Sequence, residues 1–334
     1  LYYAARDIRV FLGGLAMSRL HILQGISGTG KTSLPEAFAR AIGAGHDLVA
    51  VQAGWRDRQD LIGHYNTFER RFTEQGFLKA LYKAQCPLYC DLPFLIVLDE
   101  MNLSRPEQYF ADFLSSMERA ASRPTIDLLP APISPSPRLL QDGHRLPWPQ
   151  NVWFIGTANH DETTVEFADK TYDRAHVMEL PRNRETFELK KDLDLKKPYG
   201  LAALQRAFEK ARVQYAGDAD KACQFLHDDL AEPLGRDFRV GWGNRLEEQT
   251  RWFVPVVIAA GGSLGEAVDH LVATKLLRKV RDRHDIRSGD LKRLGEALTR
   301  SWGRLDGQHQ PTRSLEILEH EEKRLDVMRG GDGA

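Results

Sequence analysis

The sequence predicts an α/β fold in which helices cover a parallel sheet, followed by an α-helical domain. In the first part of the chain, short apolar segments alternate with helical patterns, which is typical of a buried parallel sheet. A glycine-rich turn lies directly between the first apolar segment and the first helical pattern. After Pro181 the strand patterns disappear and helical periodicity continues. The predicted strands are Leu20–Gln24, Leu48–Val51, Phe94–Leu98, Val152–Ile155 and Val177–Leu180.

The 334 residues are enough for one large domain or two domains of medium size. We expect an N-terminal helix at residues 1–18 that leads into the core. An α/β domain follows at residues 19–183, and an α-helical lid with a C-terminal tail at residues 184–334. Two stretches, residues 54–84 and 121–150, are longer than a minimal core needs and are predicted insertions. Seven prolines in the second stretch indicate a loop or hairpin rather than core.

Composition limits the classes of function. The 46 Lys and Arg residues nearly balance the 47 Asp and Glu residues, so no global basic field points to nucleic acid or a membrane. Three cysteines, Cys86, Cys90 and Cys223, are too few for a disulfide framework and suggest a reducing compartment. No signal-peptide pattern and no apolar run of about eighteen residues is recognised, so we expect a cytoplasmic protein without a membrane partner. Because the chain begins at Leu1 without an initiator Met, we expect it to be an excerpt or a processed piece of a longer protein.

The segment G-I-S-G-T-G-K-T matches the P-loop pattern G-x-x-x-x-G-K-[ST] in the strand–turn–helix context that this motif requires. Gly28 and Gly30 have no Cβ, so the backbone can curve and direct its N–H groups at a polyphosphate. The N-terminus of the following helix favours negative charge, and Lys31 is placed to reach the β- and γ-phosphates. The predicted nucleotide-binding residues of this segment are Gly25, Ile26, Ser27, Gly28, Thr29, Gly30, Lys31, Thr32 and Ser33.

Polar residues follow two of the predicted strands at the sheet edge where open α/β folds bind their ligands. The third strand runs into Asp99 and Glu100, which is the Walker B pattern. Asp99 is expected to hold Mg²⁺ together with the Thr32 hydroxyl, and Glu100 is expected to polarise the attacking water. The fourth strand delivers Asn159 to the same edge, where its amide can orient water against the γ-phosphate.

Four segments together, G-I-S-G-T-G-K-T, L-I-V-L-D-E-M-N, I-G-T-A-N-H-D-E-T-T and D-R-A, resemble an AAA+ ATPase of the McrB/MoxR (dynein-related) branch. The resemblance is closest to McrB-like NTPase motor subunits and covers residues 15–182, and more loosely the helical part. It implies a P-loop αβα core with sheet order 5-1-4-3-2, a helical lid and a ring, usually a hexamer. It also implies the role of Walker B base for Glu100 and of sensor 1 for Asn159.

The resemblance implies two further arginine roles. Arg174 lies in the D-R-A segment, where the family places an arginine finger that reaches the γ-phosphate of the neighbouring subunit. A surface salt bridge with Asp173 or Asp169 is the alternative. In the helical part, F-R-V-G-W-G-N-R resembles the segment that carries the sensor 2 arginine, a cofactor-binding residue. We predict Arg245 for this role, with Arg239 in reserve.

The first predicted insertion interleaves basic and aromatic side chains, a composition that suits single-stranded nucleic acid or a partner protein. In the resembling families such insertions line the axial face of the ring. The alternative is a solvated loop with a few packed aromatic rings. The side chains concerned are Trp55, Arg56, Arg58, Tyr65, Arg70 and Arg71.

These features together predict an AAA+ nucleoside triphosphatase that uses Mg²⁺ and forms a homo-oligomeric ring which remodels or translocates a macromolecule. ATP is favoured over GTP as the substrate because no guanine-reading motif is recognised. The expected setting is the motor subunit of a McrBC-like restriction or defence system. Its partner would be a nuclease or adaptor subunit, because the sequence has no nuclease constellation of its own. DNA and protein both stay open as the target, and so do a MoxR-like chaperone and a nucleotide-gated assembly switch with slow turnover.

Overall fold

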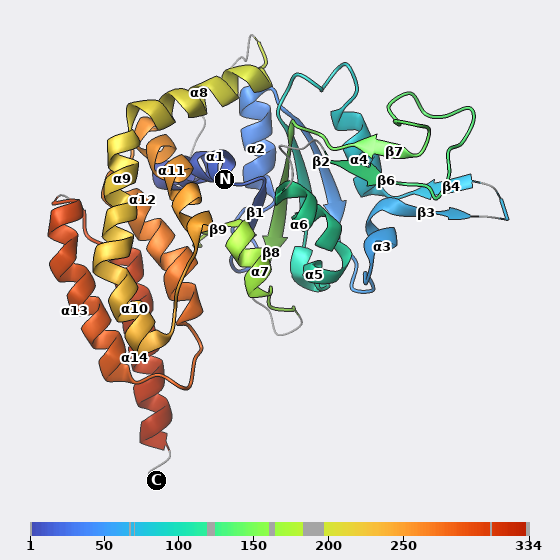
Figure 1. Ribbon diagram of the computed structural model, residues 1–334. Coiled ribbons are helices and arrows are strands. Elements are labelled where there is room, and N and C mark those ends of the chain that lie inside the picture. Colours follow the sequence, from blue (N-terminus) through green and yellow to red (C-terminus); the bar gives the residue numbers. More distant parts are fainter. Residues whose placement is uncertain are drawn as a thin grey trace. The chain divides into compact units, whose positions relative to one another are not determined.

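The computed structural model contains two compact units (Figure 1). An α/β unit comprises residues Leu1–Tyr2 and Ser18–Arg206, and a helical unit comprises Tyr3–Met17 and Ala207–Ala334. The structure describes residues 2–66, 68–69, 71–118, 124–159, 164–182, 197–307 and 309–331.

The α/β unit is built on a five-stranded parallel sheet with the order β2-β5-β8-β1-β9. Numbered along the chain from one to five, these strands have the order 5-1-4-3-2. The predicted α/β fold class and the predicted sheet order are therefore confirmed. The strands are β1 (Leu20–Gln24), β2 (Gly45–Ala50), β5 (Phe94–Asp99), β8 (Val152–Ala158) and β9 (His176–Glu179).

Helices cover both faces of this sheet because its crossovers run in two directions. α2 (Ser33–Ile42) connects β1 to the edge strand β2, whereas α4 (Gly76–Ala84), α5 (Pro106–Tyr109) and α6 (Ala111–Glu118) belong to crossovers that return from β2 towards β8. Right-handed crossovers of opposite direction place their helices on opposite faces. The loop between β1 and α2 therefore lies at the carboxyl ends of the parallel strands, on the same side of the sheet as the carboxyl ends of β5 and β8.

A cluster of aromatic rings fills the core between the sheet and helices α4 to α6. Phe77 of α4 stacks on Phe154 of β8 with ring centroids 5.7 Å apart, and it meets Phe113 of α6 edge-on at 4.9 Å. All three side chains are buried. Because protein interiors are closely packed, these contacts hold α4 and α6 against the sheet.

The insertion predicted at residues 54–84 contains two helices that contribute side chains to the core. α3 (Arg58–Ile62) buries Leu61 and its neighbour Ile62, and α4 buries five of its residues. The projecting part is the hairpin of β3 (Gly63–Asn66) and β4 (Arg71–Glu74), which extends away from the sheet in Figure 1. The sequence pattern of this stretch predicts a helix at Gly76–Ala84, and α4 has these limits.

Of the second predicted insertion, the structure describes residues 124–150, which contain a hairpin; the prediction that this stretch lies outside the core is wrong at its strands. Its strands are β6 (Thr125–Asp127) and β7 (Arg145–Pro147), which pair antiparallel. Ile126 and Leu146 face each other in this pairing and are both buried, and both join the core of the α/β unit. The hairpin is therefore anchored on the core, while the proline-rich loop between its strands carries most of the exposed residues.

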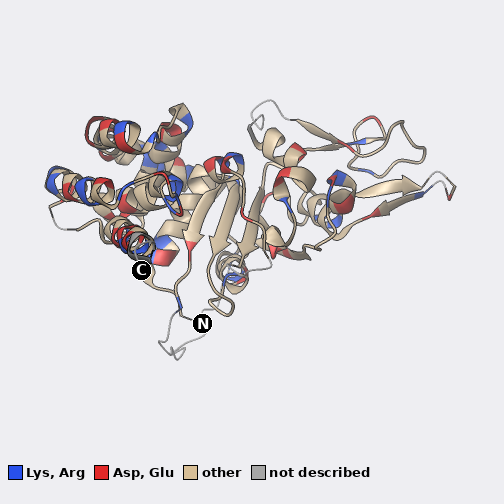
Figure 2. Ribbon diagram, turned by 90° about the horizontal axis from the view of Figure 1, so that it is seen from below, with Lys and Arg blue, Asp and Glu red and all other residues tan. Residues whose placement is uncertain are grey.

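The helical unit has the expected helical character, and its described residues contain no strand. Figure 2 shows Lys and Arg interleaved with Asp and Glu along its helices, in keeping with the balanced composition. None of the helices in the described part of the chain combines the length and the hydropathy needed to cross a lipid bilayer. The later helices are α8 (Leu201–Gln214), α9 (Ala216–Phe225), α10 (Ala231–Phe238), α11 (Asn244–Ala259), α12 (Leu264–Leu271), α13 (Ser288–Leu305) and α14 (Thr312–Gly331), with π-helical turns at Leu226–Leu230 and Val272–Leu276.

The N-terminal helix α1 (Ala5–Met17) belongs to the helical unit rather than leading into the α/β core. It lies so close to α11 that a Cβ on Gly13 would be 2.8 Å from Val257. Arg9 also forms a two-pronged ion pair with Glu266 of α12, with N–O distances of 2.8 and 2.6 Å. The two units also divide later than predicted, within α8 at Arg206 instead of at residue 183.

Candidate active site

The segment from Gly25 to Ser33 forms a tight turn between β1 and α2. Gly25, Gly28 and Gly30 have φ angles of 148°, 81° and 88°, a backbone region that favours glycine. A Cβ on Gly25 would lie 2.6 Å from the carbonyl oxygen of Leu180, so space also requires glycine there. A Cβ on Gly28 would meet nothing within 4 Å, so the backbone at the tip of the turn faces open space where a ligand can approach.

Lys31 lies inside this turn and is only 7 % exposed. Its Nζ donates hydrogen bonds to the carbonyl oxygens of Gly25 and Ile26 at 3.0 and 2.7 Å. No other Lys or Arg occurs in the segment Gly25–Ser33. A phosphate oxygen placed in the turn would thus meet one buried ammonium group whose position is set by the surrounding backbone.

The two predicted metal ligands are neighbours. The hydroxyl of Thr32, directly before α2, donates to Oδ1 of Asp99, the last residue of β5, at 2.8 Å. One carboxylate and one hydroxyl suit Mg²⁺, which usually keeps several waters and is shared with substrate phosphates. No group of three or more His, Cys, Asp or Glu side chains that could hold a metal occurs among the described residues. The donor set therefore fits a Mg²⁺ ion that binds together with a nucleotide.

Glu100 directly follows Asp99 and has a left-handed backbone, with φ 55° and ψ 47°. This conformation is uncommon for a residue other than glycine and costs on the order of 1–3 kcal/mol. The Glu100 side chain is exposed, and its Oε1 accepts a long hydrogen bond of 3.4 Å from Nδ2 of Asn159. The two residues predicted to handle the attacking water thus lie side by side at the sheet edge.

Two residues of this site were not predicted. The Thr157 hydroxyl on β8 bonds to Asp99 Oδ1 at 2.8 Å and to the Glu100 backbone N–H at 2.9 Å. Asn102 is 5 % exposed, and its Nδ2 donates to the carbonyl oxygen of Asn159 at 2.9 Å. The strand period offers a signal for Thr157, because residues two apart on a strand share a face and Thr157 lies two before Asn159.

Arg174 is the last residue of α7 (Asp169–Arg174) and is half-buried. Its Nη1 donates to the carbonyl oxygen of Lys170 at 2.9 Å, and its own carbonyl oxygen accepts from the Ser18 hydroxyl at 2.7 Å. The same hydroxyl accepts from the backbone N–H of Leu20 at the start of β1. The end of α7 is therefore tied to the strand that leads into the P-loop. A role as arginine finger stays a prediction, as does the salt-bridge alternative.

The predicted sensor 2 arginines lie in the helical unit. Arg245 is exposed in the first turn of α11, and Arg239 is the exposed C-terminal cap of α10 with a φ of 54°. Their role at the nucleotide also stays a prediction. Residues 160–163, which carry part of the N-H-D-E-T segment, lie outside the described residues.

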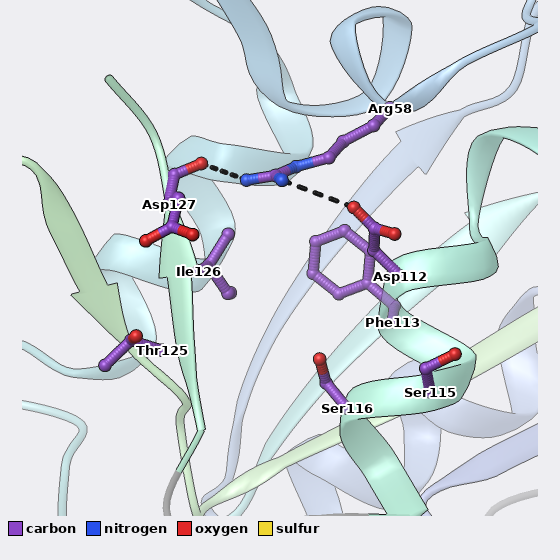
Figure 3. A pocket seen from close by; sticks show the side chains of 8 residues that line it. All are labelled: Arg58, Asp112, Phe113, Ser115, Ser116, Thr125, Ile126 and Asp127. Carbon is purple, nitrogen blue, oxygen red and sulfur yellow. Dashed lines mark hydrogen bonds and ion pairs between the residues drawn. The ribbon is translucent and has the colours of Figure 1, made fainter. Parts of the chain in front are cut away.

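Two of the basic and aromatic side chains of the first predicted insertion, Trp55 and Arg58, contact other residues of the α/β unit. Trp55 is 9 % exposed, and its ring meets that of Tyr109 edge-on at 5.3 Å. Arg58 spans a polar pocket of about 200 Å³ and donates to Asp112 Oδ2 at 3.2 Å and to the carbonyl oxygen of Asp127 (Figure 3). The burial of Trp55 agrees with the alternative of packed aromatic rings, and contact of this stretch with nucleic acid or a partner protein stays a prediction. Arg70 lies outside the described residues.

Comparisons with known proteins add little to this geometry. No protein-family model matches the chain, and no curated protein matches its sequence. Among solved structures, the chain is similar to the crystal structure of a "putative ATPase" from Cytophaga hutchinsonii ATCC 33406, with 14% sequence identity over 80% of each chain and a TM-score of 0.47. A likeness of this extent assigns no activity, so the function has to come from the residues of the site.

Proposed function

We propose that the chain is an AAA+ nucleoside triphosphatase that hydrolyses ATP in preference to GTP. The proposal rests on one observation, that three features lie together at the carboxyl ends of the parallel strands. These are the buried Lys31 in its glycine turn, the hydrogen-bonded pair of Thr32 and Asp99, and the adjacent pair of Glu100 and Asn159. A phosphate site, a Mg²⁺ site and a water-activating site together are what phosphoryl transfer to water requires.

Each residue has a defined task in this reaction. The backbone N–H groups of the glycine turn and the Lys31 ammonium would hold the phosphates, and Thr32 and Asp99 would hold Mg²⁺. The bound ion would neutralise charge on the phosphate oxygens. Glu100 would accept a proton from a water molecule that the Asn159 amide orients. The water oxygen would then bond to the γ-phosphorus as the bond to the bridging oxygen breaks, which releases the nucleoside diphosphate and phosphate.

We further propose a homo-oligomeric ring of the McrB-like type, whose active sites are completed by Arg174 of a neighbouring subunit. This part rests on the resemblance of the four sequence segments and on the position of Arg174 at the end of α7. Such a ring would be the motor of a restriction or defence system, and a nuclease or adaptor subunit would be its partner. Its target would be a macromolecule that the ring remodels or translocates.

Phosphate release from ATP and from GTP, measured with the full chain, tests this function. We expect Mg²⁺-dependent release that is faster with ATP and is stimulated by DNA. Stimulation by unfolded protein instead of DNA would indicate a MoxR-like chaperone. Slow release that neither polymer changes would indicate an assembly switch. If neither nucleotide is hydrolysed with Mg²⁺ over a wide range of protein concentration, the proposed function is wrong.

A further inference from the structure

We propose that Thr157 is a positioning residue whose single hydroxyl group couples the Mg²⁺ ligand Asp99 to the backbone of the catalytic base Glu100. The inference rests on the proposed function and deepens it, because it names the group that holds both halves of the site in register. Thr157 would touch neither the nucleotide nor the ion, and would act through the two residues that do.

The hydroxyl of Thr157 forms two hydrogen bonds, one as donor and one as acceptor. Its Oγ1 lies 2.8 Å from Asp99 Oδ1 and 2.9 Å from the backbone nitrogen of Glu100. A hydroxyl offers one donor and two acceptor sites. Since the Glu100 N–H can only donate, Thr157 accepts a hydrogen bond from it and donates one through its own O–H to the Asp99 carboxylate. The side chain is 2 % exposed, so water does not compete for either bond.

Asp99 is held by two hydroxyl groups from different elements. Its Oδ1 accepts from Thr32 at the start of α2 and from Thr157 on β8, each at 2.8 Å. Its Oδ2 accepts no hydrogen bond from the described residues, so this oxygen is left for a cation. Hydrogen bonds from outside the coordination sphere orient metal ligands, and their loss typically weakens metal affinity or activity about 10–100-fold.

The backbone of Glu100 gives the second reason for a positioning role. Its left-handed conformation, with φ 55°, is one that surrounding contacts have to maintain. In this conformation the Glu100 N–H donates its hydrogen bond to Thr157. Glu100 is also the residue directly before the turn Met101–Leu103. The Thr157 hydroxyl is therefore one of the contacts that hold the Glu100 backbone, from which the carboxylate projects, in this conformation.

Gly156, the residue before Thr157 on β8, supports the positioning role of Thr157 because it has no side chain. Gly156 lies opposite Leu98 in the pairing of β8 with β5, so Thr157 follows level with Asp99. A Cβ on Gly156 would lie 2.3 Å from the sulfur of Met101, which shows how closely the turn after Glu100 approaches β8. Gly156 allows the turn to come this close to β8, and the hydroxyl of the next residue, Thr157, bonds to the Glu100 N–H at the start of that turn.

A purely structural role is the competing explanation, and three variants of the full chain separate the two. Thr157→Val keeps the β-branched shape but removes the hydroxyl, and Thr157→Ser keeps the hydroxyl. Thr274→Val is the matched control, because Thr274 is a buried threonine of the helical unit whose hydroxyl bonds to the His270 carbonyl at 2.7 Å. If Thr157→Val fails to fold, Thr157→Ala is measured in its place.

The affinity for Mn²⁺, measured by electron paramagnetic resonance in the presence of ADP, is the main readout because it needs no turnover. For Thr157→Val we expect Mn²⁺ affinity and turnover each to fall about 10–100-fold, while ADP binding without a divalent ion stays as in the wild type. Thr157→Ser and Thr274→Val should both retain wild-type Mn²⁺ affinity.

Three results distinguish a failure of this inference from a failure of the proposed function. Wild-type Mn²⁺ affinity and turnover in Thr157→Val, with a wild type that binds and hydrolyses nucleotide, would overturn the positioning role alone. An equal loss of Mn²⁺ affinity in Thr274→Val would overturn it as well, since any lost buried hydroxyl would then suffice. A wild-type chain that binds neither ADP nor Mn²⁺ would overturn the proposed function, and the inference with it.

Discussion

Replacement of Arg174 by alanine is expected to lower turnover per subunit by about 10³–10⁵-fold, which is the contribution of arginine fingers supplied in trans in other P-loop enzymes. The reason is that each active site would be shared between two subunits. Turnover per wild-type subunit should then rise steeply with protein concentration, because it follows the population of assembled ring. Phosphate release measured over a dilution series of both proteins checks both expectations.

Mixing two inactive variants gives the sharper form of this test. Arg174→Ala has an intact P-loop and Lys31→Ala has an intact finger, so an interface between them holds one complete site and the mixture should regain activity. A salt bridge of Arg174 with Asp173 or Asp169 predicts otherwise, with a loss of about 0–1 kcal/mol in the free energy of unfolding and turnover independent of concentration. An inactive mixture, together with equal wild-type turnover at high dilution, would contradict a shared site.

Replacement of Glu100 by glutamine is expected to keep nucleotide binding and to slow hydrolysis by about 10²–10⁴-fold, the usual contribution of a positioned general base. The amide has the size of the carboxylate, and its oxygen can still accept the hydrogen bond from Asn159. It cannot take a proton from water. Phosphate release and ATP affinity by calorimetry, measured on the same protein, separate the two effects.

A second glutamate provides the control for this substitution. Glu36 lies on α2, forms an exposed ion pair with Arg40 and takes no part in the site, so Glu36→Gln should hydrolyse ATP at the wild-type rate. Undiminished hydrolysis by Glu100→Gln would mean that another residue activates the water. A loss of ATP affinity in Glu100→Gln would instead place its carboxylate in nucleotide binding.

The parts of the fold that the sequence predicts well are those in which local pattern and burial agree. Parallel strands covered on both faces read as continuous apolar runs, so all five core strands were found. The sequence also predicts the limits of α2, because its helical pattern runs from Ser33 to Ile42 and Gly43 ends the helix with a left-handed φ of 67°. β2 was predicted to begin three residues too late, since it is an edge strand whose first residues include the polar His46 and Asp47.

The features that were missed depend on contacts between distant parts of the chain. The amphipathic pattern of α1 predicts that one face is buried, but it does not say that this face packs on α11. In the site, Asp99, Glu100 and Asn159 follow from their places after strands, whereas the left-handed backbone of Glu100 has no sequence signal. The two bonds of Thr157 arise from strand register, which a single sequence does not contain.

The central claim is that the glycine turn around Lys31 binds nucleoside triphosphate, and calorimetric titration with ATP and Mg²⁺ tests it most directly. Lys31→Ala removes the one cation that the turn Gly25–Ser33 offers to the phosphates, and Lys79→Ala removes an exposed lysine of α4 as the control. We predict that the wild type and Lys79→Ala bind ATP, and that Lys31→Ala keeps the thermal stability of the fold but shows no binding. Equal ATP affinity in Lys31→Ala and the wild type would contradict the account.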